Sequence, residues 1–141
     1  MFSDLEPKHL LLGAFVAVAI AAAVSVHLSI RTKARRFVHG RPRLSSAEFA
    51  ALFRTEAEAA LAPVIRDRLR AYIPVDPALV RPDDKLCDEL QLAVVDGLDA
   101  NAFVREVETV VGTKIPDQEA QRMFTLRDIV SYVAARSERA T

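Results

Sequence analysis

The sequence predicts an all-α protein in which a single N-terminal transmembrane helix precedes a small bundle of about four helices. Residues 10–30 contain no Asp, Glu, Lys or Arg. The remaining chain repeats its apolar residues at helical spacing, and no stretch alternates as a strand does. Charge divides the 141 residues into the same two parts, an N-terminal part and a bundle. Seven basic residues against two acids give residues 1–43 a charge of +5, and 12 against 17 give residues 44–141 a charge of −5.

Composition excludes several functional classes. A single cysteine, Cys87, cannot form an intrachain disulfide, and no Cys or His spacing resembles a zinc site. All three histidines lie within the first 39 residues, so residues 44–141 have no imidazole for acid–base or metal chemistry. We therefore expect neither an enzyme nor a metal centre.

The first element follows a short tail, residues 1–9. At about 1.5 Å per residue, the 21 residues of 10–30 reach about 30 Å, the thickness of the hydrocarbon layer of a bilayer. The basic residues follow this run, whereas a cleavable signal peptide carries them in front. The order predicts a single-pass protein of the inner (cytoplasmic) membrane, with its N-terminus outside and its C-terminal domain in the cytoplasm.

Two features of this region suggest contacts. Small residues recur every four positions and predict a packing face for another membrane helix: Gly13, Ala17, Ala21, Ser25 and Ser29. Residues 31–44 form a basic juxtamembrane linker without acids, and we expect its cations at lipid headgroups: Arg31, Lys33, Arg35, Arg36, Arg41 and Arg43. As a nucleic-acid site this segment is too short and has one aromatic residue, so no nucleic-acid partner is expected.

The next elements come from capping and proline signals. Ser45 and Glu48 form a capping box that opens an amphipathic connecting helix over residues 45–62. Pro63 is expected to split or kink the helical pattern, and we begin the bundle there, at 63–136, with a tail at 137–141. Three prolines make Ile73 to Asp84 a loop.

The last three helices are predicted from caps and apolar spacing. A helix over Leu98 to Val111 has Asp96 or Asp99 as its N-cap and stops at Gly112. A short helix follows Ile115-Pro116-Asp117. Thr125 and Asp128 form a second capping box before the final helix.

The segment from about Val64 to Ala135 resembles an acyl carrier protein domain. The resemblance lies in Asp96-Gly97-Leu98-Asp99 at the start of a helix, in the Ile115-Pro116-Asp117 turn, and in the start of the last helix, Thr125-Leu126-Arg127-Asp128-Ile129-Val130. In that family the motif is Asp-Ser-Leu, and the serine hydroxyl carries 4'-phosphopantetheine.

Gly97 stands at the serine position, flanked by Asp96, Leu98 and Asp99, and glycine has no nucleophile. No Ser, Thr or Tyr occurs from Cys87 to Glu108, so no shift of register supplies one. The resemblance therefore implies a degenerate site, and we expect no 4'-phosphopantetheine. We interpret Cys87 as a small buried hydrophobe rather than an attachment site.

The resemblance also implies docking through an acidic second helix. The acids Asp96, Asp99, Glu106 and Glu108 remain, whereas Arg105 interrupts the face. An ordinary solvated helix face is an equal alternative. A separate acidic cluster lacks the pattern of a calcium loop and is interpreted as solvated charge: Asp83, Asp84, Asp88 and Glu89.

These observations favour a membrane-anchored, non-catalytic acyl-carrier-like protein that acts as an interaction or accessory module. Its partner is expected to be a membrane-bound or membrane-associated protein. Two alternatives stay open. One is a genuine acyl or peptidyl carrier for a membrane-associated lipid or secondary-metabolite pathway, and the other is a single-span accessory subunit of a membrane complex.

Overall fold

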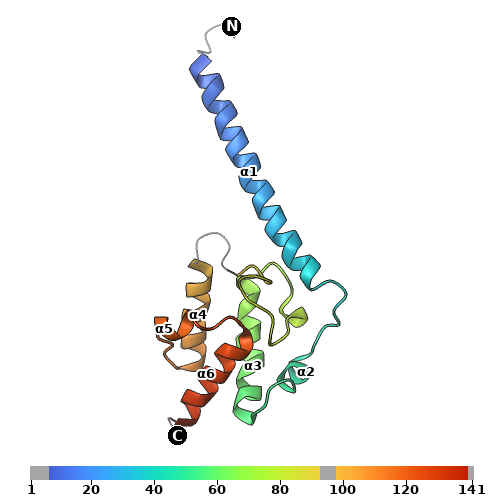
Figure 1. The fold of residues 1–141 in the computed structure, drawn as a ribbon, viewed down its shortest axis with the longest axis vertical. Coiled ribbons are helices and arrows are strands. Elements are labelled where there is room, and N and C mark those ends of the chain that lie inside the picture. The colour runs from blue at the N-terminus through green and yellow to red at the C-terminus, as the bar shows by residue number, and fades with distance from the viewer. Residues whose placement is uncertain (1–6, 93–97, 140–141) are drawn as a thin grey trace.

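The fold is all-α, as predicted. A computed structural model describes residues 7–92 and 98–139, and within these ranges it contains six α-helices, two 3₁₀ turns and no strand. The α-helices are α1 (Pro7–Phe37), α2 (Ser46–Ala50), α3 (Glu56–Arg68), α4 (Leu98–Val111), α5 (Asp117–Ala120) and α6 (Leu126–Arg139). The 3₁₀ turns cover Leu69–Ala71 and Pro77–Leu79. Figure 1 shows α1 projecting from a bundle formed by the other helices.

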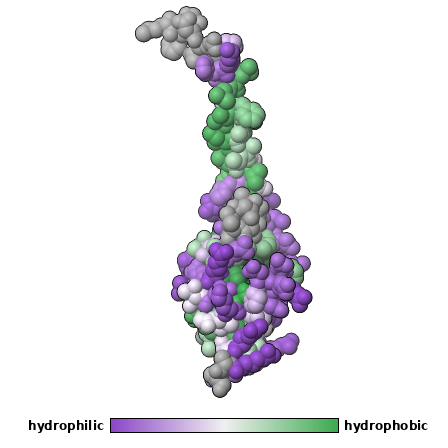
Figure 2. Space-filling view, turned by 90° about the vertical axis from the view of Figure 1, so that its left-hand side faces the viewer, coloured by the Kyte–Doolittle hydropathy of each residue, from purple (hydrophilic) through white to green (hydrophobic). Residues whose placement is uncertain are grey.

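Helix α1 is long and apolar enough to cross a membrane. The side chains of residues 10–29 are exposed rather than packed against the bundle, and Figure 2 shows a hydrophobic shaft above a mostly hydrophilic bundle. The helix runs beyond Ile30 to Phe37, so the first half of the expected linker, residues 31–37, is helical. Arg, Lys and Ala are good helix formers, which accounts for the extension.

The predicted connecting helix is two helices. Ser45 caps α2 with both bonds of the capping box, from the Glu48 N–H to Ser45 Oγ and from the Ser45 N–H to the Glu48 carboxylate. Thr55 then accepts a bond from the Glu58 N–H and opens α3. A single helix over 45–62 was therefore wrong, because a second N-cap interrupts it.

Pro63 does not divide the chain. It lies inside α3, so the domain boundary that we drew at residue 63 falls within a helix. Proline removes one hydrogen bond to the carbonyl four residues earlier. The neighbouring side chains Ala62 and Ile65 are fully buried, and their packing holds the helix together across this gap.

The later elements match the prediction closely. Helix α4 has the predicted bounds and ends at Gly112, which adopts φ +69°, a left-handed conformation that favours glycine. Asp99 lies in the first turn of α4 and is not its N-cap, while Asp96 lies outside the described residues. Thr125 and Asp128 exchange both capping-box bonds at the start of α6.

One apolar core joins the bundle. Helix α3 packs against α6, α2 and α4. Ile65 of α3 and Leu69 of the 3₁₀ turn that follows it are fully buried together with Phe49 of α2, Phe103 of α4 and Val130 of α6. Several side chains from the segments between helices complete the core: Val80, Leu86, Leu90, Leu92 and Ile115.

We expect Ile65→Ala to lower the free energy of unfolding by about 2–5 kcal/mol, because it leaves a cavity at a fully buried position. The neighbouring Val64→Ala is the matched control, since Val64 is 41% exposed and surface substitutions usually change stability by only about 0.5 kcal/mol. Urea unfolding of the full chain in detergent, followed by circular dichroism, measures both. Equal losses would contradict the assigned core.

Candidate functional site

The candidate site is the N-terminal end of α4. Gly97 and Asp96 lie outside the described residues, and α4 begins at Leu98. The first described side chain of this end, Asp99, is exposed. The sequence from Cys87 to Glu108 contains no hydroxyl side chain, so this end of the helix has no hydroxyl nucleophile.

Glu106, which we expected on a docking face, binds groups of its own bundle. Its carboxylate accepts a hydrogen bond from the Tyr72 hydroxyl and lies 3.4 Å from Arg68 Nη1. The Tyr72 ring packs edge-on against Phe103, with 5.7 Å between the ring centroids. The hydrogen bond to Glu106 raises the pKa of Tyr72, and partial burial raises it further. Glu106 thus joins α4 to the end of α3.

Glu108 also has an internal partner. Its Oε1 accepts a hydrogen bond from the Ile115 N–H at 3.0 Å, which ties the end of α4 to the turn before α5. Asp99 and Arg105 are exposed, and among the described residues neither side chain forms a hydrogen bond or an ion pair. Docking at this face stays a prediction, and Glu106 and Glu108 also have partners within the bundle.

Cys87 is exposed, so the interpretation as a buried hydrophobe was wrong. The surrounding protein still removes part of its water, and this desolvation raises the pKa of the thiol, as does the charge of Asp88. A raised pKa keeps the thiol protonated at neutral pH, and the protonated form is a poor nucleophile. The Cys87 thiol is therefore a poor nucleophile at neutral pH.

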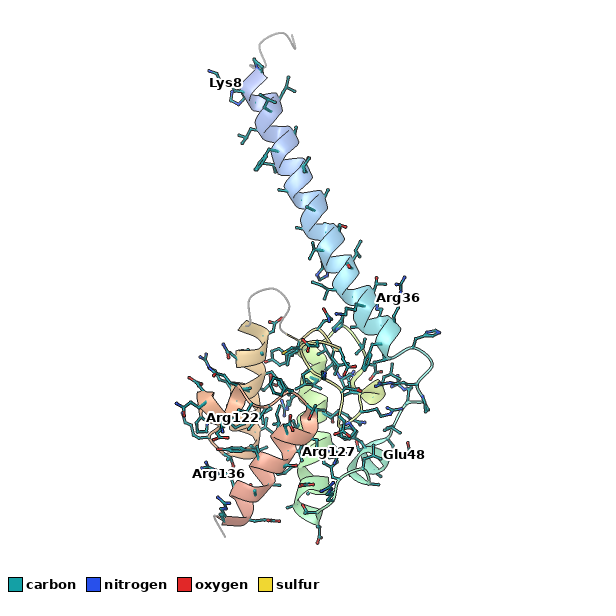
Figure 3. All side chains as sticks on the ribbon, viewed as in Figure 1. Lys8, Arg36, Glu48, Arg122, Arg127 and Arg136 are labelled. Carbon is teal, nitrogen blue, oxygen red and sulfur yellow. The ribbon has the colours of Figure 1, made fainter. Side chains whose placement is uncertain are left out.

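The basic residues after the apolar run fall into two groups. The side chains on α1 are exposed, and Figure 3 shows Arg36 where α1 meets the bundle. These remain candidates for lipid headgroups: Arg31, Lys33, Arg35 and Arg36. Arg41 and Arg43 instead bind the bundle, through ion pairs of 2.6 Å with Asp84 and Asp76. Contact of these two residues with lipid headgroups stays a prediction, and each also has a carboxylate partner in its own chain.

The small-residue face of α1 is free of the bundle. Its members are all exposed: Gly13, Ala17, Ala21, Ser25 and Ser29. A shallow hollow at the end of this face nearer the bundle is lined by Ser25, Ser29, Thr32 and Arg36, among others. Among the residues that the structure describes, no group of three or more His, Cys, Asp or Glu side chains could hold a metal ion.

Comparison with known proteins identifies relatives of about half the chain. The acyl carrier protein of Campylobacter hominis is 32% identical over 69 residues, which are 49% of this chain and 84% of that protein. The acyl carrier protein of Bdellovibrio bacteriovorus is 30% identical over 74 residues, which are 52% of this chain and 91% of that protein. That of Campylobacter concisus is 30% identical over 69 residues, 86% of its length. No protein-family model matches the chain.

Glu106→Gln is expected to lower the pKa of Tyr72 toward its usual value of about 10, because the carboxylate that favours the neutral phenol is removed. A Tyr132→Phe background leaves Tyr72 as the single tyrosine, and ultraviolet absorbance follows its titration. Since the folded pKa is raised, this interaction stabilises the fold below about pH 10 and is lost as the pH rises through the raised pKa. An unchanged titration would show that Glu106 does not bind Tyr72.

Proposed function

The chain belongs to the acyl carrier protein family, and on this premise we propose that it is a membrane-anchored, non-catalytic member that carries no 4'-phosphopantetheine. Its bundle acts as an interaction or accessory module for a membrane-associated protein. The observation that carries this proposal is Gly97 at the position of the attachment serine, in a stretch from Cys87 to Glu108 without any hydroxyl side chain.

The chemistry of the bundle supports a role without catalysis. Residues 44–141 contain no histidine, and the exposed thiol of Cys87 is held protonated by its raised pKa. Glu106 and Glu108 are engaged in bonds that hold the fold together. With no base, nucleophile or metal set assembled among the described residues, binding is the activity that remains.

Anchoring fits an interaction module. Residues 10–30 have the length and composition of a membrane span, and the cations that follow favour a cytoplasmic bundle. Figure 3 shows the opposite end of α1, marked by Lys8, far from the bundle. Confinement to the membrane raises the effective concentration of the bundle near a membrane partner without adding contacts.

Co-expression with a phosphopantetheinyl transferase is expected to leave the mass of the polypeptide unchanged, because Gly97 offers no hydroxyl. A Gly97→Ser variant is the matched test, since it restores the attacking atom and changes nothing else in the motif. Intact mass spectrometry distinguishes the two chains. A pantetheine-sized increment on the parent chain would overturn the proposal and favour a genuine acyl or peptidyl carrier.

Anchoring is tested by carbonate extraction of membranes that contain the full chain. The parent protein is expected to stay in the membrane. Ala17→Arg combined with Ala21→Arg is expected to release it, because each charge at the centre of a span costs about 2.5–3.5 kcal/mol.

Ala17→Leu combined with Ala21→Leu is the control for this pair, because leucine keeps the span apolar while filling the small-residue face. This control should remain anchored. Loss of a co-purifying membrane partner from the leucine variant alone would assign the small-residue face to helix packing. Release of the parent chain by carbonate would contradict the anchor.

A further inference from the structure

The hollow on α1 is formed by that helix alone. Six residues line it: Ser25, Leu28, Ser29, Thr32, Lys33 and Arg36. They recur at spacings of three and four positions, which places them on one face of the helix. The hollow has a volume of about 530 Å³, within the range of about 300–1,000 Å³ that is typical of small-molecule sites. It is therefore large enough to take part of a lipid molecule.

The opposite face of α1 is bound to the bundle. Ala34 is fully buried, and Ile30 and Phe37 are half-buried. With 3.6 residues per turn, Ala34 lies about 180° around the helix from Ser25 and about 160° from Arg36. The hollow therefore faces away from the bundle.

The chain that follows α1 holds the helix in this orientation. Val38 is 3% exposed, and Arg41 forms two bonds with the Asp84 carboxylate, at 2.6 and 3.1 Å. Two-point contact between a guanidinium and a carboxylate fixes their relative orientation. The buried Arg66 of α3 donates to the Leu44 carbonyl at 3.0 Å. Because the segment 38–44 is bound in this way, the hollow cannot turn toward the bundle while these contacts last.

The two cations of the hollow have no acidic partner. Among the residues that the structure describes, the side chains of Lys33 and Arg36 form no ion pair and no hydrogen bond. By contrast, Arg41 and Arg43 each pair with a carboxylate at 2.6 Å. No acid lines the hollow. Two unpaired cations without a neighbouring acid complement an anion.

These cations lie at the level of lipid phosphates when α1 spans a bilayer. Lys33 and Arg36 follow Ile30, the end of the apolar run, by three and six residues, which are about 4.5 and 9 Å along a helix. Long side chains on a helix lean toward its N-terminus, which here is toward the lipid. The headgroup layer is about 5–8 Å thick. Both charged groups therefore reach this layer.

The other lining residues match the layer beneath the phosphates. Ser25 and Ser29 lie within the apolar run, and their hydroxyls form no hydrogen bond with another described residue. The Thr32 hydroxyl, in contrast, donates to the Leu28 carbonyl at 2.7 Å. A hydroxyl without a partner is costly in an apolar medium, and the ester oxygens of a lipid can accept its hydrogen bond. The Leu28 side chain adds an apolar contact for an acyl chain.

We infer that this hollow binds one anionic glycerophospholipid, with Lys33 and Arg36 at its phosphate and the two serines beside its ester groups. Lipid binding at this site rests on the proposed anchoring of α1. Arg31 and Arg35 lie at the same level but outside the hollow, so they add only the diffuse attraction of a basic flank. A zwitterionic lipid is bound less well, because its own cationic group is repelled by the two cations.

Native mass spectrometry of the full chain in a non-ionic detergent tests the site, with dioleoylphosphatidylglycerol or dioleoylphosphatidylcholine added in turn. The parent chain is expected to bind one phosphatidylglycerol about fivefold more tightly than phosphatidylcholine, because only the former has a net charge. Lys33→Gln combined with Arg36→Gln is expected to weaken binding of phosphatidylglycerol about tenfold, since both cations are lost.

Two variants serve as controls. Arg31→Gln combined with Arg35→Gln removes the same charge at the same level and should weaken binding by no more than about threefold. Ser25→Leu combined with Ser29→Leu fills the hollow and keeps every cation, so it should weaken binding as strongly as the loss of Lys33 and Arg36. Circular dichroism verifies that each variant keeps its helical content.

The outcomes separate a built site from a basic flank. Equal losses in the two glutamine variants would overturn the lipid site, and so would unchanged lipid binding in the leucine variant. Loss of a co-purifying membrane protein from that leucine variant, with lipid binding unchanged, would assign the hollow to another helix instead. If carbonate releases the parent chain, the anchoring fails and the lipid site fails with it. If carbonate retains the chain and the two glutamine variants lose equally, the lipid site alone is rejected.

Discussion

The rest of the bundle depends on the apolar contact between α3 and α6. Ile65 of α3, Leu69 of the 3₁₀ turn that follows it and Val130 of α6 are all fully buried, and the other elements add their side chains to this contact. The loop before α4 contains no α-helix among its described residues, and Val80, with its side chain in the core, helps to fix its path. Because that loop carries Asp84, the core also determines where Arg41, and through it α1, is held.

Local sequence signals predicted much of this fold, since caps and apolar spacing act over a few residues. Both capping boxes form, and α4 has its predicted bounds. Long-range pairs were not predictable in this way. Asp84 looked like a solvated acid and Arg41 like a lipid-binding cation, yet 43 residues apart in sequence they form one shielded ion pair. Glu106 and Tyr72 likewise meet only through the packing of α3 on α4.

The candidate site was predicted in part. The resemblance to acyl carrier proteins could be recognised from the sequence, because each of its motifs is a short run of consecutive residues. The comparison with acyl carrier proteins agrees with it. The internal use of Glu106 and Glu108 was not visible, because an acid on a solvated face and an acid bound to a neighbouring segment have the same sequence spacing. The sequence does show directly that residue 97 is a glycine and has no hydroxyl group.

We propose that this acyl-carrier-like chain works without a prosthetic group. The mass of the intact protein purified from its native membranes tests it most directly, because the cell's own modifying enzymes have then had access to the chain. The expected mass is that of the polypeptide alone. A fraction carrying 4'-phosphopantetheine, with or without an acyl chain, would contradict it.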